Sequence, residues 1–236
     1  MVNKVLIDKK GNYNYWTSAD FHSLYGTIKE KDIKNGIIKS HIGKDFICFD
    51  ASFIDKLQKI KRGPAVTHLK DIGFIISNTG ISKESKIVDA GSGSGLLCSF
   101  LSLVSDNVTS YESNPEFFKI AEQNIKFLNV KVNLKNKDIT KCIDETNLDL
   151  ITLDLLEPWL VLEHAYNALK SGSFLVCYLP NITQVSKLIK ESKNFNFITY
   201  KVSEVLEREW LVEELKARPK NQMLGHTAFI VFLRKY

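Results

Sequence analysis

The sequence predicts an α/β fold: a mainly parallel sheet covered by helices and preceded by a small β-rich module. From about Ile72 onward, short apolar strand patterns alternate with helical patterns, as they do in βαβ units. One of these strands runs directly into a glycine-rich loop. Residues 1–60 instead show short apolar stretches and turn residues without a helical period. The chain has 236 residues, which suffices for one domain of ordinary size and a small appendage.

Composition excludes membrane-spanning and secreted classes. Hydrophobic residues make up 44% of the chain and charged residues 25%, the balance of a soluble globular protein. No apolar run approaches the roughly 20 residues of a membrane span, and the first apolar stretch is too short for a secretory signal. We therefore expect a cytoplasmic protein without a membrane partner.

The charge and the cysteines of the chain limit which metals and partners can be expected. The four cysteines are widely spaced without a CxxC pair, and the five histidines show no ligand spacing, so we expect no metal. A net charge of +5 is compatible with a polyanionic partner without establishing one. The few arginines, including Arg218, are better candidates for fixed phosphate contacts than the scattered lysines, because a guanidinium forms two-pronged hydrogen bonds.

The predicted N-terminal domain, residues 1–60, has three stretches of strand character: Val5–Ile7, Tyr13–Trp16 and Asp45–Asp50. The dipeptide Asn35-Gly36 precedes two isoleucines and suits a tight hairpin turn. Residues Lys56–Pro64 have the composition of a connector. We therefore assign residues 61–236 to a second domain.

The second domain is predicted from alternating patterns. Strands are expected at Lys86–Ala90, Val108–Glu112, Lys131–Lys135, Leu148–Asp154 and Phe174–Leu179. A helix is expected over Leu96–Val104, and another after Ser113-Asn114-Pro115, a polar cap followed by a first-turn proline. Near the end of the chain, Phe197–Val205 and Ala228–Leu233 suit an antiparallel pair at one edge of the sheet.

The glycine loop is the strongest local signal. It has the form GxGxG, and Leu96 stands where a dinucleotide fingerprint requires a third glycine. This difference favours S-adenosylmethionine, which has no pyrophosphate to hold. We expect the cofactor to contact the consecutive residues Gly91, Ser92, Gly93, Ser94, Gly95 and Leu96.

Acidic residues follow the next two strands. Glu112 ends the strand after the loop, where an acid in a doubly wound, Rossmann-like fold accepts hydrogen bonds from ribose hydroxyls. Asp138, with Ile139 beside it, follows the third strand, where it can read an adenine amino group. Because ligands bind at the carboxyl ends of such strands, we assign all three residues to the cofactor site.

Asp154 marks the fourth strand end. Apolar residues precede it, so we expect its carboxylate at the rim beside the cofactor, and Pro158 shapes the loop that follows. A carboxylate and the aromatic ring of Trp159 beside a methyl donor suit a heteroaromatic substrate that carries an amino group.

The sequence resembles the TrmI-type tRNA (adenine-N1)-methyltransferases. The matching stretches are Asp154–Trp159 (DLLEPW), Tyr178–Val185 (YLPNITQV) and Gly225–Val231 (GHTAFIV), with a lead-in at Arg62-Gly63-Pro64 and Lys70-Asp71. The resemblance covers residues 60–236 well and the N-terminus loosely. It departs from the family at Leu156, where a proline is common, and at His68-Leu69, where an aromatic residue or histidine is followed by proline.

This resemblance implies a Rossmann-like class I methyltransferase fold that binds S-adenosylmethionine and tRNA. It implies methylation of adenine N1 at tRNA position 58, and in archaeal members also at position 57, by a homotetramer. It further implies three catalytic residues: Asp154, which also touches the cofactor, Tyr178 and His68. Arg218, His226 and Thr227 belong to the block near the substrate cleft.

The residues alone leave other functions open. A precorrin methyltransferase or a protein isoaspartate methyltransferase would share the glycine loop but not the stretches that carry the resemblance. A non-catalytic tRNA-binding subunit would be expected to lose the glycine loop and Asp154, and both are present.

Overall fold

A computed structural model describes residues 2–63, 66–213 and 215–236 of the chain. The chain divides into two compact units. One runs to Lys61 and includes Lys126–Asn129, and the other comprises Arg62–Ile125 and Val130–Tyr236. Pro64, at the end of the expected connector, lies outside the described residues.

The first unit is an antiparallel β-structure. Its four-stranded sheet has the order β2-β1-β6-β5, with bounds Tyr13–Trp16, Lys4–Ile7, Asp45–Asp50 and Gly36–Lys39. A separate hairpin joins β3 (Phe21–Ser23) to β4 (Gly26–Ile28), and the short helices η1 (Glu30–Asp32), α1 (Phe53–Lys56) and η2 (Leu57–Lys59) complete the unit. Leu6, Ile28, Phe46 and Cys48 form its buried core. The expected three strands are confirmed.

The expected hairpin turn at Asn35-Gly36 is wrong. Gly36 is the first residue of β5 and pairs with Cys48, so the strand has already begun there. The turn that joins β5 to β6 lies at residues 40–44, where the Ser40 carbonyl accepts a bond from the Gly43 amide at 2.8 Å. Asparagine and glycine favour left-handed backbone wherever the chain bends, and Gly36 has a φ of 113° without closing a hairpin.

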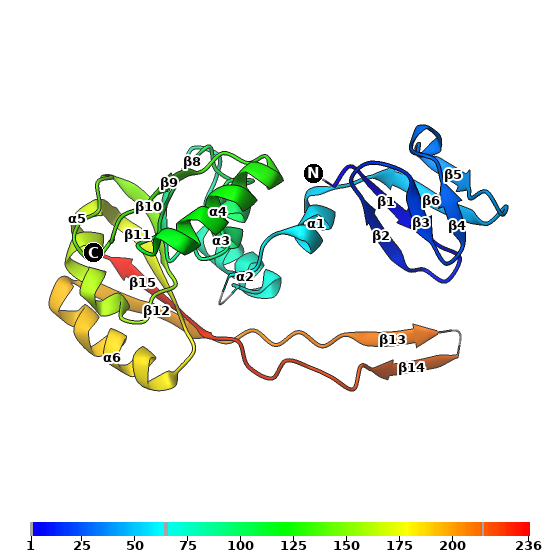
Figure 1. The fold of residues 1–236 in the computed structure, drawn as a ribbon. Coiled ribbons are helices and arrows are strands. Elements are labelled where there is room, and N and C mark those ends of the chain that lie inside the picture. The colour runs from blue at the N-terminus through cyan, green and yellow to red at the C-terminus, as the bar shows by residue number, and fades with distance from the viewer. Residues whose placement is uncertain (1, 64–65, 214) are drawn as a thin grey trace. The chain divides into compact units, whose positions relative to one another are not determined.

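The second unit is built on a seven-stranded sheet of order β12-β15-β11-β10-β7-β8-β9 (Figure 1). The bounds are Phe197–Ser203, Phe229–Lys235, Leu169–Leu179, Leu148–Leu153, Lys86–Ala90, Asn107–Tyr111 and Asn133–Lys135. The strands from β11 to β9 pair in parallel, and β15 pairs antiparallel with both β11 and β12. The expected class I α/β fold with its antiparallel edge is confirmed.

Helices cover both faces of this sheet. In Figure 1, α2 (Leu69–Thr79), α3 (Leu96–Leu101) and α4 (Pro115–Leu128) lie on one side, and α5 (Leu162–Ala168) and α6 (Ile182–Ser192) on the other. The short helices η3 (Pro158–Val161) and η4 (Lys193–Phe195) flank α5 and α6. The expected helix over Leu96–Val104 ends earlier, and the strand expected from Phe174 begins at Leu169.

A hairpin arm interrupts the last two strands of the sheet. Strands β13 (Trp210–Glu213) and β14 (Lys216–Pro219) pair with each other and with no other described strand. Its apolar side chains are exposed, with Trp210 at 56% and Val212 at 69%. Sequence analysis missed this arm, because its short strands lack the apolar continuity of the sheet strands.

Candidate active site

The site lies where the strand order reverses. From β7 the chain adds β8 and β9 on one side and β10 and β11 on the other, so the loops after β7 and β10 diverge. Ligands of open α/β sheets bind in the crevice formed at such a point. The glycine loop follows β7 and Asp154 follows β10, so two predicted site elements meet here.

The backbones of these two loops touch. The Asp154 amide donates to the Ala90 carbonyl at 2.9 Å. A Cβ atom on Gly91 would lie 2.1 Å from the carbonyl oxygen of Asp154, and the φ of Gly91 is 84°. Only glycine allows this approach, which places the backbone of Asp154 beside the glycine loop.

The Asp154 side chain is half-buried. Burial raises the pKa of its carboxyl to about 7, the charge of Asp89 adds to the rise, and a hydrogen bond from Thr67 opposes it. Asp89 is itself 1% exposed and accepts bonds from the Ser110 and Thr152 hydroxyls at 2.6 and 2.7 Å. Burial raises the pKa of Asp89 to about 6, so two carboxyls titrate near neutrality at this strand edge.

The glycine loop is held in shape by its own backbone. Gly93 and Gly95 have φ angles of 52° and 76°, and the Gly95 amide donates to the Ser92 carbonyl at 2.6 Å. The Ser92 hydroxyl lies 2.6 Å from that of Ser110, so this predicted cofactor contact is tied into the loop. Ser94 and Leu96 are buried at 3% and 6% exposure.

Gly63 lies against this loop. A Cβ on Gly63 would lie 3.3 Å from the Ser94 amide nitrogen, a tight contact that glycine avoids. Gly63 therefore packs against the backbone that is expected to hold the methionine part of the cofactor.

A pocket of about 220 Å³ opens beside the loop, lined by Gly91, Glu112, Asp138 and Ile139 among others. Glu112 accepts bonds from the Gly93 and Asn114 amides, both at 2.9 Å, which fixes its carboxylate at the pocket edge. Leu155, Leu156 and Leu160 supply apolar walls. Carboxylates at the rim and apolar walls between them suit the ribose and adenine of S-adenosylmethionine.

A buried polar cluster that includes Tyr178, the neighbour of Asp154 on the next strand, joins α2, β11 and the segment before β15. Asp71, at 0% exposure, accepts bonds at Oδ2 from the hydroxyls of Tyr178 and Thr227, each at 2.8 Å. Lys70 Nζ donates to Asp71 Oδ1 and to the Thr227 hydroxyl, both at 2.7 Å. Tyr178 and Thr227, predicted separately, are thus brought together by residues of α2.

The remaining predicted substrate residues lie further out. His68 and Arg218 line one polar hollow of about 550 Å³ together with Lys70 and Lys220. The ring of His226 lies 2.6 Å from the Glu204 carboxylate and 2.9 Å from the Pro180 carbonyl. His226 therefore holds the base of the hairpin arm, and the structure brings it to neither pocket.

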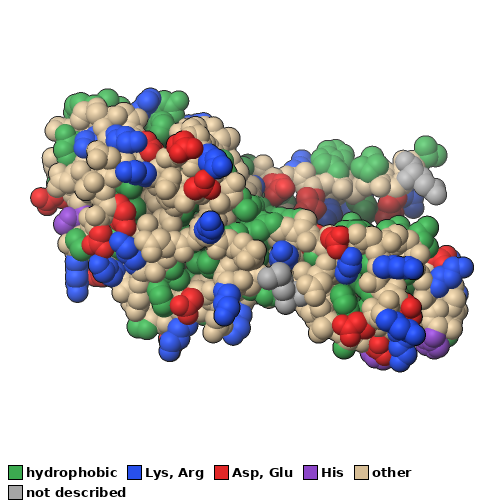
Figure 2. Space-filling view, turned by 90° about the horizontal axis from the view of Figure 1, so that it is seen from above, with side chains coloured by type: hydrophobic (Ala, Val, Ile, Leu, Met, Phe, Trp, Pro, Cys, Tyr) green, Lys and Arg blue, Asp and Glu red, His purple; other side chains and the backbone are tan. Residues whose placement is uncertain are grey.

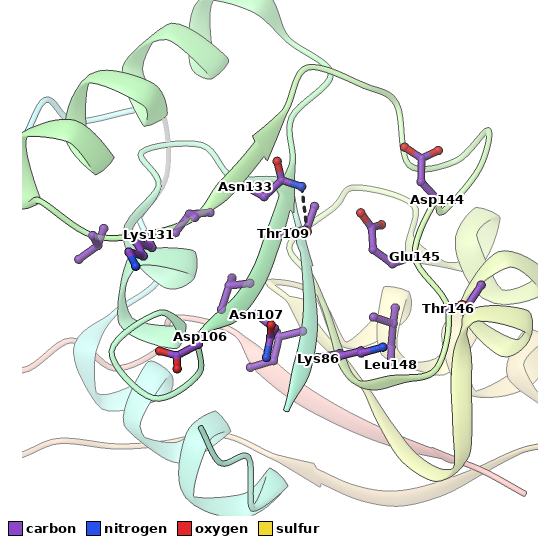
Figure 3. A pocket seen from close by; sticks show the side chains of 14 residues that line it. Lys86, Asp106, Asn107, Thr109, Lys131, Asn133, Asp144, Glu145, Thr146 and Leu148 are labelled. Carbon is purple, nitrogen blue, oxygen red and sulfur yellow. Dashed lines mark hydrogen bonds between the residues drawn. The ribbon is translucent and has the colours of Figure 1, made fainter. Parts of the chain in front are cut away.

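A larger hollow, of about 810 Å³, lies elsewhere. Its lining includes Lys86, Asn107, Asn133 and Leu148, which stand at the amino ends of β7, β8, β9 and β10 (Figure 3). This end of the strands is opposite to the one that holds Asp154. It is open and lined by charges of both signs, so size alone would have pointed to the wrong end of the sheet.

The described parts of the chain contain no group of three or more His, Cys, Asp or Glu side chains placed to hold a metal ion. No helix in those parts is long and apolar enough to cross a bilayer.

Comparison with protein families decides the assignment. Residues 60–218 match the family model described as tRNA methyltransferase complex GCD14 subunit. The chain belongs to the TrmI/GCD14 family of tRNA methyltransferases. It is 34% identical to a tRNA (adenine(57)-N(1)/adenine(58)-N(1))-methyltransferase TrmI of Methanocaldococcus jannaschii, over 98% of this chain and 94% of that protein. It is also 34% identical to a tRNA (adenine(58)-N(1))-methyltransferase TrmI of Thermus thermophilus, over 92% and 89%.

Solved structures agree with this family at the level of the fold. A SAM-dependent O-methyltransferase of Thermotoga maritima superposes with a TM-score of 0.89 at 27% identity, over 99% of this chain and 92% of that one. A tRNA (m1A58) methyltransferase TrmI of Aquifex aeolicus gives 0.83 at 26%, over 99% and 96%. As a member of this family the chain uses S-adenosylmethionine, which the loop and pocket geometry fit.

Sequence analysis did not name Thr67, Asp71 or Asp89 as site residues, although Asp71 stands in the lead-in that resembles the family. Asp71 and Ile75 are four residues apart, and both are buried on the inner face of α2. An acid on an apolar helix face was the available signal, because a carboxylate is rarely buried without partners. Asp89 is the last residue but one of β7, two residues before Gly91. Nothing in the sequence near Thr67 indicates its contact with Asp154.

Proposed function

We propose that this chain transfers the methyl group of S-adenosylmethionine to N1 of an adenine in tRNA, at position 58 and, as in the archaeal relative, also at position 57. The observation that carries the proposal is the half-buried residue Asp154, whose backbone lies against the glycine loop of a chain that belongs to this family. Relatives that match over nearly the whole chain are named for this reaction.

The chemistry calls for an acceptor beside the reacting base. Adenine N1 is a weak nucleophile on the pairing edge, so the base must leave its helix to react. S-adenosylmethionine, when bound, supplies an electrophilic methyl group on a positively charged sulfur. A cation near Asp154 lowers the pKa of this carboxyl from its raised value, so the loaded site holds it ionised.

Ionised Asp154 accepts a hydrogen bond from the exocyclic amine of the adenine. This bond increases electron density at N1 and stabilises the cationic methylated ring. Its placement beside the loop would orient the base toward the bound cofactor, and such positioning is the main catalytic contribution. A single well-placed group of this kind contributes about 3 kcal/mol of barrier lowering.

We assign cofactor binding to the loop Gly91–Gly95 with Leu96, and to Glu112, Asp138 and Ile139. The last three line the 220 Å³ pocket beside Gly91. Glu112 would receive the ribose hydroxyls and Asp138 the adenine amine. The backbone of the loop, next to Gly63, would hold the methionine part.

We assign tRNA binding to the hollow that His68 and Arg218 line, next to the cluster of Tyr178 and Thr227. Basic side chains are dispersed among acidic ones on the face in Figure 2, with no single continuous basic patch there. In the hollow, Lys70 is paired with Asp71 and Lys220 with Glu209, so the exposed guanidinium of Arg218 is the positive group that we assign to a phosphate of the tRNA. We expect binding that weakens as salt rises.

Residues 1–60 form a small N-terminal domain in this proposal and residues 61–236 the catalytic domain. The protein would work in the cytoplasm as a homotetramer. Exposed apolar side chains along the β13–β14 arm, visible in Figure 2, support assembly, because contiguous exposed apolar surface marks contact with another chain.

The direct test incubates the chain with unmodified tRNA and methyl-labelled S-adenosylmethionine, followed by nucleoside analysis. We expect 1-methyladenosine from intact tRNA and none from a transcript with guanine at positions 57 and 58. A methylated corrinoid from a precorrin substrate, with no methylated tRNA, would overturn the proposal. Cofactor binding measured by calorimetry separates an active enzyme from a non-catalytic tRNA-binding subunit.

A further inference from the structure

The buried cluster around Asp71 has no role in the mechanism above. The side chains of Lys70 and Asp71 are 9% and 0% exposed, so an ion pair is buried beside the active site. Burying both charges costs free energy that an apolar pair would not cost. The packing of α2 therefore does not explain why this ion pair is present. We look for the explanation in the hydrogen bonds that the pair makes with neighbouring side chains.

The cluster decides the direction of a hydrogen bond. Tyr178 has a single hydroxyl proton, which it donates to Asp71 Oδ2 at 2.8 Å. Burial and the neighbouring Asp71 raise the pKa of Tyr178, so the phenol keeps this proton. An Asp71 carboxylate that already receives bonds from Lys70 and Thr227 has no proton to give back. The Tyr178 oxygen therefore presents only lone pairs to any further partner.

That oxygen belongs to the same edge as Asp154. Leu153 of β10 pairs with Cys177 of β11, so Asp154 and Tyr178 are the next residues along two adjacent parallel strands. Side chains at equivalent positions of adjacent parallel strands lie on the same face of the sheet, so the two residues are neighbours there. The edge thus offers two acceptors from neighbouring strands.

We propose that Asp71 is a positioning residue that holds the Tyr178 hydroxyl as an acceptor for the exocyclic amine of the target adenine. This inference rests on the proposed function. Asp154 takes one amine hydrogen and Tyr178 the other. A purine with an oxygen at this position meets two acceptors and is rejected, because its acceptor is left unpaired.

The substitution Asp71→Asn reverses the arrangement. The new amide must turn its oxygen to the ammonium of Lys70, because its own N–H groups repel that charge. The amide nitrogen then faces Tyr178 and Thr227, where Asp71 Oδ2 was. The Tyr178 oxygen then accepts a hydrogen bond from this amide. The hydroxyl proton of Tyr178 turns toward the substrate, where it faces an N–H of the adenine amine, so that two donors meet.

The experiment measures single-turnover methylation of two tRNAs that differ at one position. One carries adenosine at the methylated site, and the other carries purine ribonucleoside, which lacks the amine. The readout is the adenosine-to-purine ratio of rates for each enzyme. The intrinsic reactivity of the two bases is the same for every variant and cancels when the ratios are compared. We expect the ratio to fall about 3- to 10-fold in Tyr178→Phe, the worth of one neutral hydrogen bond, and about 10-fold or more in Asp71→Asn.

The matched control is Asp149→Asn. It also removes the carboxylate partner of a lysine, Lys170 at 2.6 Å, but at the opposite end of β10. We expect it to leave the ratio unchanged. Folding of each variant is checked by circular dichroism and by cofactor binding, and Tyr178→Phe alone suffices if Asp71→Asn does not fold.

An unchanged ratio in Tyr178→Phe and in any folded Asp71→Asn would overturn the inference while leaving the proposed function intact. Absence of 1-methyladenosine with the unaltered chain and the adenosine tRNA would instead overturn both.

Discussion

The two halves of the active site are assembled differently. On the cofactor side, Gly93 bonds to Glu112 and Ser92 to Ser110, contacts that span 19 and 18 residues of chain. On the substrate side, Tyr178 and Thr227 reach Asp71 across 107 and 156 residues. One half is a contiguous motif that a single βαβ unit builds. The other exists only after α2, β11 and the segment just before β15 have come together.

This difference predicts where substitutions act. The cofactor half depends on backbone geometry, so replacing one glycine there is expected to abolish binding. The substrate half depends on side-chain protons and charges, so changes there are expected to alter turnover, selectivity and pH dependence while the fold persists.

The largest effect is expected from Gly91→Ala. A Cβ at this position would lie 2.1 Å from the carbonyl oxygen of Asp154, so the loops after β7 and β10 must separate. We expect no measurable cofactor binding by calorimetry and a loss of about 3 kcal/mol or more in the free energy of unfolding. The control is Gly73→Ala in α2, which has open space and should stabilise by about 0.5 kcal/mol. Wild-type affinity in Gly91→Ala would contradict the loop geometry.

The next effect is expected from Asp154→Asn. Turnover should fall about 100- to 1000-fold, because an amide cannot supply the charge that stabilises the methylated ring. Cofactor affinity, dominated by the glycine loop and Glu112, should change less than 5-fold, about 1 kcal/mol. Equal losses in turnover and cofactor affinity would place Asp154 in the cofactor half alone.

The same residue predicts a pH profile. Because burial raises the pKa of Asp154 to about 7, kcat/KM for the cofactor, which reports on the free enzyme, should rise as pH passes through about 7. This step should vanish in Asp154→Asn. A profile that is identical in both proteins would assign the titration to another group, for which Asp89 is the first candidate.

The stability of the folded chain should fall, rather than rise, as pH increases through the same range. The folded-state pKa of Asp154 lies above its ordinary value of 3.8, so the folded chain binds the proton more tightly than the unfolded one. The contribution to stability is present below pH 4 and is lost as pH rises through about 7. At pH 8 the free energy of unfolding of Asp154→Asn should therefore exceed that of the wild type by about 2 kcal/mol, which thermal unfolding would show as a higher midpoint. At pH 4 this difference should disappear. A gap independent of pH would contradict this.

The smallest effect concerns the base of the arm. The Glu204 carboxylate, and then the Pro180 carbonyl, raise the pKa of His226 above 6.5. Both ring nitrogens can donate only in the charged form, so one bond is lost as pH rises through that raised pKa. Hydrogen exchange of backbone amides in residues 204–226, corrected for intrinsic pH dependence, should become faster above it. His226→Gln should show no such step.

Much of the fold could be predicted from the sequence because its signals are local. Apolar runs of strand length, alternation with helical patterns and the glycine loop after Ala90 each depend on neighbours within one βαβ unit. The same holds for Glu112 and Asp138, whose functional positions follow from strand ends. The hairpin turn assigned to Asn35-Gly36 failed for the complementary reason: a residue pair that favours a bend does not say which strands the bend connects.

By itself, then, the sequence determined the order of strands and helices, the cofactor loop and the position of the acid that follows β10, since these depend on backbone propensity and on apolar periodicity. Only the tertiary structure decided that Asp71 holds Tyr178, that Thr67 touches Asp154 and that His226 braces an arm. The direction of a hydrogen bond and the pKa of a buried carboxyl depend on partners that the chain brings from far away. No local sequence pattern predicts them.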